Sequence, residues 1–144
     1  MAELLLVGVD GSEASRRALY FAAEVANRLG ADLLVAHVVP DMPGGDLAPQ
    51  APEVRFGQQE AEVNQAHAHL LEPLVTEARD RGVYVELKVL HGDPATALAD
   101  LAVMREARQI FIGRTGHTRM REFLFGSVPA TLSHKATVPV TLVP

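Results

Sequence analysis

The sequence predicts an α/β fold, an open and mainly parallel sheet of five strands with helices on both faces. Two observations carry this prediction. First, five short apolar runs are rich in β-branched residues, and most of them lack the polar alternation of a strand with one face in water. Second, these runs alternate along the chain with segments of helical apolar spacing, which is the element order of a parallel sheet covered by helices.

Each expected helix has a start or stop signal. Ser12 is a favourable N-cap for the first helix, and Gly30 stands just past its end. Asp93 and Pro94 suit the cap and the first position of the third helix, and Ser127 caps the fourth. The strands are expected at Leu4–Val9, Leu33–Val39, Val83–Leu90, Gln109–Ile112 and Val138–Val143, and the helices at 13–29, Gln58–Arg81, 94–104 and 127–136.

The segment Pro40–Gly57 departs from this alternation. It holds four prolines and three glycines in 18 residues, a composition that disfavours a helix or a central strand. The 39 residues before it are too few for a domain, so we expect a long loop inside a single domain that spans residues 1–144. A chain of 144 residues has the usual length of one domain.

Composition and charge exclude several classes of protein. The chain has no cysteine, so disulfides, thiolate zinc sites and a cysteine nucleophile are excluded. Its net charge of −5 argues against non-specific binding of nucleic acid. No stretch approaches the 18 uncharged apolar residues of a membrane span, and the expectation is a soluble, cytoplasmic protein.

The chemistry of the chain is expected on the loop that follows the fourth strand. Gly113, Gly116 and the pair Gly126-Ser127 let backbone amides approach a phosphate, and Ser127 opens a helix whose free amides attract an anion. The spacing is neither that of a P-loop nor that of the dinucleotide fingerprint. Basic side chains surround these glycines. They are Arg114, His117, Arg119 and Arg121.

These residues resemble the universal stress protein family, whose nucleotide-binding members carry Gly, two residues, Gly, nine residues and Gly-Ser/Thr. Gly113, Gly116 and Gly126-Ser127 match that motif in full, and the resemblance covers the whole chain. It implies an adenine-nucleotide alpha-hydrolase-like sheet of order 3-2-1-4-5, with the ends of strands 1 and 4 side by side. It also implies that ATP or another adenine nucleotide binds there. Arg114-Thr115 and Pro129 depart from the residues that the family more often has at these positions.

The resemblance implies a set of nucleotide-binding residues at the strand ends and on the loop. Asp10 would contact the ribose or the adenine, and it is also the candidate ligand for a magnesium ion. The strand-end residues would act largely through their backbone groups. The full set is Gly8, Val9, Asp10, Val38, Ile112, Gly113, Arg114, Gly116, His117, Gly126, Ser127 and Val128.

The remaining histidines give weak signals. His67 and His69 are two residues apart on a helix and point to different faces, which is wrong for a shared metal and favours a solvated surface. His37 is expected to be a hydrogen-bonded histidine at a strand end. No partner for His91 or His134 can be identified from the sequence.

Three functions remain open. The leading hypothesis is a stress-response or regulatory protein that binds ATP and hydrolyses it slowly or not at all. The alternatives are an enzyme that cleaves ATP, for which no general base is evident, and an interaction module without a ligand, against which the intact motif argues. The last strand is apolar and lies at a sheet edge in the resembling fold, which predicts a homodimer through Val138, Val140 and Leu142.

Overall fold

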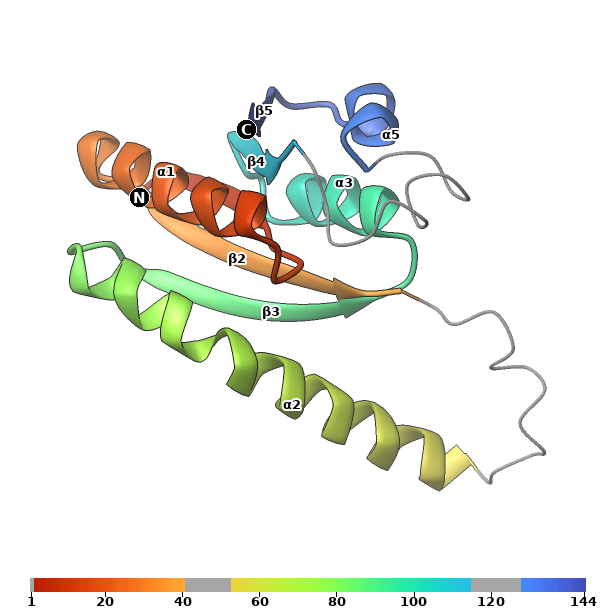
Figure 1. Cartoon of the computed structure of the whole chain (residues 1–144). Coiled ribbons are helices and arrows are strands. Elements are labelled where there is room, and N and C mark those ends of the chain that lie inside the picture. The colour runs from red at the N-terminus through yellow and green to blue at the C-terminus, as the bar shows by residue number, and fades with distance from the viewer. Residues whose placement is uncertain (1, 41–52, 115–127) are drawn as a thin grey trace.

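The computed structural model describes residues 2–40, 53–114 and 128–144, with several residues of the second helix described by their backbone alone. Strands and helices alternate along the chain as the sequence predicts (Figure 1). The elements are β1 (Leu4–Gly8), α1 (Glu13–Leu29), β2 (Asp32–Val39), α2 (Glu53–Asp80), β3 (Val85–His91), α3 (Pro94–Met104), β4 (Gln109–Gly113), α5 (Val128–Lys135) and β5 (Val140–Val143).

All five strands form one parallel sheet in the order β3-β2-β1-β4-β5, which confirms the predicted fold class and strand order. β1 therefore lies in the middle, between β2 and β4, while β3 and β5 form the two edges. The register places Gly8 of β1 beside Ala36 on one side and Ile112 on the other. The carboxyl ends of the three central strands consequently meet at one edge of the sheet, which is where open α/β sheets bind ligands.

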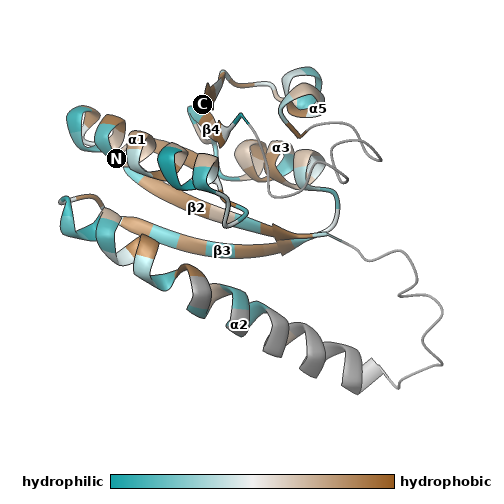
Figure 2. Cartoon of the chain, in the orientation of Figure 1, coloured by the Kyte–Doolittle hydropathy of each residue, from teal (hydrophilic) through white to brown (hydrophobic). Residues whose placement is uncertain are grey.

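Helices cover both faces of this sheet, as predicted, because the central strands carry apolar side chains on both sides. Leu5 and Val7 of β1 pack with α1 and α2 in one buried cluster. Leu6, one residue out of phase, packs with α3 and α5 in the other. Figure 2 shows the consequence in the strands: β2 is apolar along most of its length, whereas the edge strand β3 alternates between apolar and polar residues.

α1 is defined at both ends by its sequence. The Ser12 side chain accepts a hydrogen bond from the Ser15 amide, and Gly30 ends the helix in a left-handed conformation with φ of 65°. The face of α1 that contacts the sheet consists largely of small residues, and this lets the helix lie close to the strands. Its buried residues are Ala14, Ser15, Ala18, Leu19, Ala22, Ala23 and Ala26.

The expectation for the segment Pro40–Gly57 is wrong at its C-terminal end, because α2 begins at Glu53. The four prolines of the segment all precede Glu53 in the sequence, so none of them opposes the helix. Gly57 alone disfavours the helix there, by about 1 kcal/mol, which a long helix tolerates.

At the other end of the chain, Val138 precedes β5 rather than lying in it. In the described ranges, no helix combines the length and the apolar character needed to cross a bilayer.

Candidate functional site

The ends of β1 and β4 lie next to each other at the centre of the carboxyl edge. The pairing of Gly8 with Ile112 brings the following residues, Val9-Asp10 and Gly113-Arg114, into neighbouring positions. The Val9 amide continues the ladder by donating to Ala36 O at 2.9 Å, and the Arg114 amide donates to Val143 O at 2.7 Å. Both strand ends are thus held by backbone hydrogen bonds beyond the last residue of the strand.

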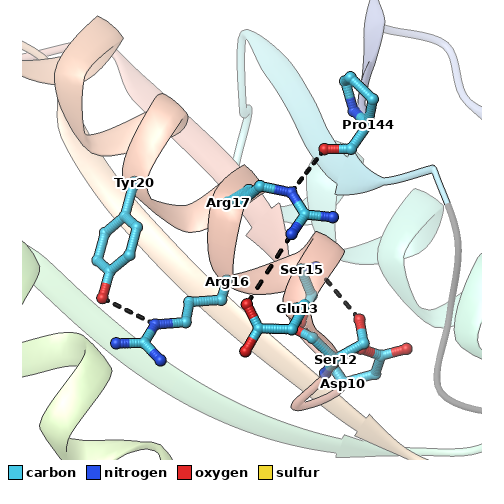
Figure 3. A network of polar contacts seen from close by, with 8 residues as sticks. All are labelled: Asp10, Ser12, Glu13, Ser15, Arg16, Arg17, Tyr20 and Pro144. Atoms are coloured by element: carbon cyan, nitrogen blue, oxygen red, sulfur yellow. Dashed lines mark hydrogen bonds and ion pairs between the residues drawn. The ribbon is translucent and has the colours of Figure 1, made fainter.

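The turn from β1 into α1 is fixed by its own polar side chains (Figure 3). Asp10 Oδ1 accepts from the Ser12 amide at 2.9 Å, and the Asp10 amide donates to Ser15 Oγ at 3.3 Å. The same Ser15 hydroxyl donates to Ser12 O at 2.9 Å. Gly11, at φ of 86°, supplies the conformation that this tight turn needs. Asp10 is therefore an exposed carboxylate held in a defined position at the end of the central strand.

Gly113 allows α1 to pack against the end of β4. A Cβ atom at this position would lie 2.7 Å from Ala14 C and from Ser15 N, and 2.9 Å from Ala14 Cβ. Real Cβ atoms do not approach backbone this closely, so any side chain would push the first turn of α1 off the sheet. The structure gives Gly113 a packing role that the sequence pattern, interpreted as a phosphate loop, did not suggest.

The valine and isoleucine side chains at the other strand ends are buried, and Gly8 has no side chain. The side chains of Val9, Val38 and Ile112 are at most 9% exposed, and a Cβ at Gly8 would meet Leu98 Cδ1 at 2.8 Å. Arg114 is exposed, and Val128 packs on the cluster beneath α3 and α5. The remaining expected residues lie outside the described ranges. They are Gly116, His117, Arg119, Arg121, Gly126 and Ser127.

A pair of histidines, His37 buried and His67 half-buried, lies beside this edge. His37 Nδ1 is 2.7 Å from Val9 O, and His37 Nε2 is 2.7 Å from Nδ1 of His67 on α2. Burial lowers the pKa of His37 below its ordinary value, and the His67 ring acts in the same direction, while the Val9 carbonyl and the Asp10 carboxylate oppose them. His37 is hydrogen-bonded, as predicted. The expectation that His67 is only solvated is wrong.

A second contact was also invisible in the sequence. His91, at the end of β3, contacts Asn64 Oδ1 on α2 at 2.5 Å. The partners of both histidines lie about 30 residues away, so only the position of α2 over β2 and β3 brings them together. Within the described part of the chain, no three His, Cys, Asp or Glu side chains converge as metal ligands would.

α1 also contacts the last strand. Arg17 Nε donates to the carbonyl oxygen of Pro144 at 2.8 Å, and Nη1 of the same side chain is 3.9 Å from Glu13 Oε2 (Figure 3). One helix thus carries the Asp10–Ser12 turn at its N-terminus and, one turn later, holds the end of β5.

Comparison with known proteins gives consistent matches. The model of the universal stress protein family matches residues 1–144. The universal stress protein Rv1636 of Mycobacterium tuberculosis is 30% identical, with 96% of this chain and 94% of that protein covered. The structure of the universal stress protein from Archaeoglobus fulgidus in complex with dAMP is 27% identical and covers 99% of this chain and 98% of that chain, with a TM-score of 0.66. A universal stress protein in complex with cAMP, 24% identical over 99% of this chain and 96% of that one, has the same fold with a TM-score of 0.69.

Proposed function

This chain belongs to the universal stress protein family, and we propose that it is a regulatory protein that binds an adenine nucleotide, ATP, at the carboxyl ends of β1 and β4. The observation that carries the proposal is the position of the Gly113–Ser127 motif. It begins at the end of β4, directly beside the end of the central strand β1, and it leads into α5. The Archaeoglobus fulgidus relative solved with dAMP supports an adenine nucleotide as the ligand.

The described residues suit the nucleoside half of such a ligand. The Asp10 carboxylate, fixed by the Ser12 amide, accepts hydrogen bonds from ribose hydroxyls. The adenine would lie against the backbone at the ends of β1 and β2, where Gly8 has no side chain and the side chains of Val9 and Val38 are buried in the core. The triphosphate would lie on the amides of the 113–127 loop, with Arg114 and the other basic residues of the loop around it.

Magnesium fits this site only as a companion of the phosphates. Mg²⁺ is held by one or two carboxylates together with phosphate oxygens and waters rather than by an all-protein cage. Asp10 is an exposed carboxylate at the right edge, and the described residues contain no group of three ligands that would bind the ion without the nucleotide. Asp10 is therefore the residue that would contribute a ligand.

Hydrolysis is expected to be slow or absent. The loop supplies amides and cations that stabilise charge, but fast phosphoryl transfer also needs a group that positions water and accepts its proton. Phosphate release measured with purified protein should stay well below about one turnover per second, the lower end of the range for kinases. Faster release would support an ATP-cleaving enzyme instead.

We also propose that the protein is a cytoplasmic homodimer, with no nucleic acid or membrane as partner. The position of β5 at the edge of the sheet supports the homodimer. Ile110 N donates to Pro139 O, so the backbone groups of Val140 and Leu142 point away from β4 toward the open edge. Leu142 is 45% exposed. Pairing of β5 with its copy would satisfy these backbone groups and cover Leu142, with Val138 beside it.

Calorimetric titration with ATP tests the site. Gly126→Val places a side chain where a phosphate must approach, and the affinity for ATP should fall at least about tenfold. Ser133→Ala is the matched control, because Ser133 lies on the exposed side of α5, where its hydroxyl bonds to Ala130 O. A folded Gly126→Val variant that binds ATP like the wild type would show that the phosphates lie elsewhere.

A further inference from the structure

The His37–His67 contact joins three elements through one buried polar group. His37 is 8% exposed although it lies in β2 among the apolar core residues. Its ring bridges the carbonyl of Val9, the residue after β1, and the middle of α2. The two rings are inclined by 24°, with their centroids 4.6 Å apart.

The chemistry of the partners fixes the protons of the neutral pair. The Val9 carbonyl can only accept, so Nδ1 of His37 carries a hydrogen and its Nε2 accepts one from Nδ1 of His67. The contact uses Nδ1 of His67, and its Nε2 can therefore take a first proton without disturbing the pair. A second proton on His37 Nε2 would place two N–H groups against each other at 2.7 Å. The doubly protonated pair cannot keep the contact.

This contact holds a part of α2 that has little apolar anchoring among its described side chains. The described side chains of α2 that are buried in the core all lie in its C-terminal half. They are Leu71, Val75 and Ala78. Among the described side chains of the preceding turns, those that contact the sheet do so through polar groups, from His67 to His37 and from Asn64 to His91. Histidines therefore make both of the contacts that attach the described side chains of these turns to the sheet.

We propose that the His37–His67 pair is a pH-operated latch, which holds the turn of α2 around His67 against the carboxyl edge of the sheet and releases it when the pair takes up a second proton. The latch is a property of the fold and does not depend on nucleotide binding.

The surroundings of His37 set the direction of the response. Among the described residues, Asp10 and His67 are the titratable groups that act on its ring, and burial outweighs the favourable effect of Asp10. On β3, the residue opposite His37 is the uncharged Val89, and His91 is the next residue on the same face. Folding lowers the pKa of His37, so burial of its neutral ring favours the folded state fully only above about pH 6.5, the ordinary histidine value. This contribution to the free energy of unfolding is lost as the pH falls below that value.

The Asn64–His91 contact should survive this change. Asn64 Oδ1 accepts a hydrogen bond from Nε2 of His91. A histidine ring with a hydrogen on Nε2 can donate this bond whether the ring is neutral or charged. The expected opening is therefore local, centred on His67.

Amide hydrogen exchange of the full chain without nucleotide, corrected for intrinsic rates, tests the latch. Between about pH 7.5 and about pH 4.5, protection of residues 64–70 should fall at least about fivefold, the ratio expected for the loss of one ordinary hydrogen bond. Residues 75–80, anchored by Val75 and Ala78, should change much less. In the variant His67→Gln, residues 64–70 should stay protected at both pH values. The glutamine NH2 group can donate to neutral His37, and the glutamine carbonyl oxygen can accept from charged His37.

His69→Gln is the matched control. His69 lies two residues away on the same helix, its side chain is 84% exposed, and its contact is with Glu72 at 3.6 Å. This variant should respond to pH like the wild type.

Unchanged wild-type protection at residues 64–70, or an equal loss in His67→Gln, would overturn the proposal. If His67→Gln is loose at both pH values, the nitrogen-15 spectrum of the wild-type histidines decides. Protonation of His37 at the same midpoint as the loss of protection supports the latch, and separate midpoints reject it.

Discussion

Replacing Gly113 by alanine tests the close packing of α1 on β4. The added methyl group would lie 2.7 Å from two backbone atoms of α1, Ala14 C and Ser15 N, and backbone cannot rotate away as a side chain can. Overpacking of this kind costs about 1–3 kcal/mol. Alanine also restricts the unfolded chain, which offsets about 0.4–1 kcal/mol of that cost. We therefore expect a net loss of about 1–2 kcal/mol, or about 3–6 °C in Tm for a chain of this length.

Urea denaturation and thermal melting without nucleotide measure this loss, since a bound ligand would mask it. Gly8→Ala is the matched control, because the Cβ there would meet the end of a flexible side chain, Leu98 Cδ1, at 2.8 Å. Leu98 can adjust, so the loss should be smaller than for Gly113→Ala. If Gly113→Ala is as stable as the wild type, or more stable than Gly8→Ala, then α1 does not press on the end of β4 as described.

Three further predictions concern charge, assembly and capping. ATP binding should weaken as salt rises because the 113–127 loop is basic, whereas binding of adenosine, which has no phosphates, should change little. Equal salt dependence of the two ligands would show that the basic residues of the loop have no role in binding. Sedimentation at micromolar concentration should give about twice the chain mass of 15.5 kDa, and Val140→Pro should shift it toward the monomer by removing an outward N–H. A wild-type monomer, or a folded Val140→Pro dimer, would contradict pairing through β5. Asp93 caps α3 by accepting from the Thr96 amide at 3.0 Å, which lowers the pKa of its carboxyl. Asp93→Ala should therefore cost about 1 kcal/mol at neutral pH. This difference in the free energy of unfolding should shrink as the pH falls below about 4, the ordinary aspartate value, toward the lowered pKa of the folded carboxyl. A constant difference down to low pH would refute the charged cap.

The order of strands and the two-layered core could be predicted because local pattern and topology agree. Runs such as Leu33–Val39 are apolar on both faces, and Ser12 and Gly30 mark the two ends of α1 by local chemistry alone. The start of α2 was missed because four prolines dominate the composition of the segment, although they all precede Glu53. Composition over a window cannot tell on which side of a boundary a proline lies.

The local geometry of the candidate site could be predicted only where neighbours in sequence act together. Asp10, Gly11 and Ser12 form one turn, and the glycine spacing after β4 can be seen in the sequence. The packing role of Gly113 depends on Ala14, about 100 residues away, and the partner of His37 lies on a helix whose position over the sheet no local pattern gives. Such contacts follow from the tertiary structure.

The central position of β1 has a consequence for the growing chain. β1 is made first, and β2 reaches it within about 30 residues, but its other neighbour, β4, is about 100 residues away, since Leu5 pairs with Gln109. At about 5–20 residues per second, the second edge of this apolar strand waits roughly 5–20 s on the ribosome for its partner. During that time its N–H and C=O groups are open to other chains. Newly made chains are therefore most exposed to aggregation before β4 emerges, and a slow or stalled ribosome between β3 and β4 should lower the yield of folded protein.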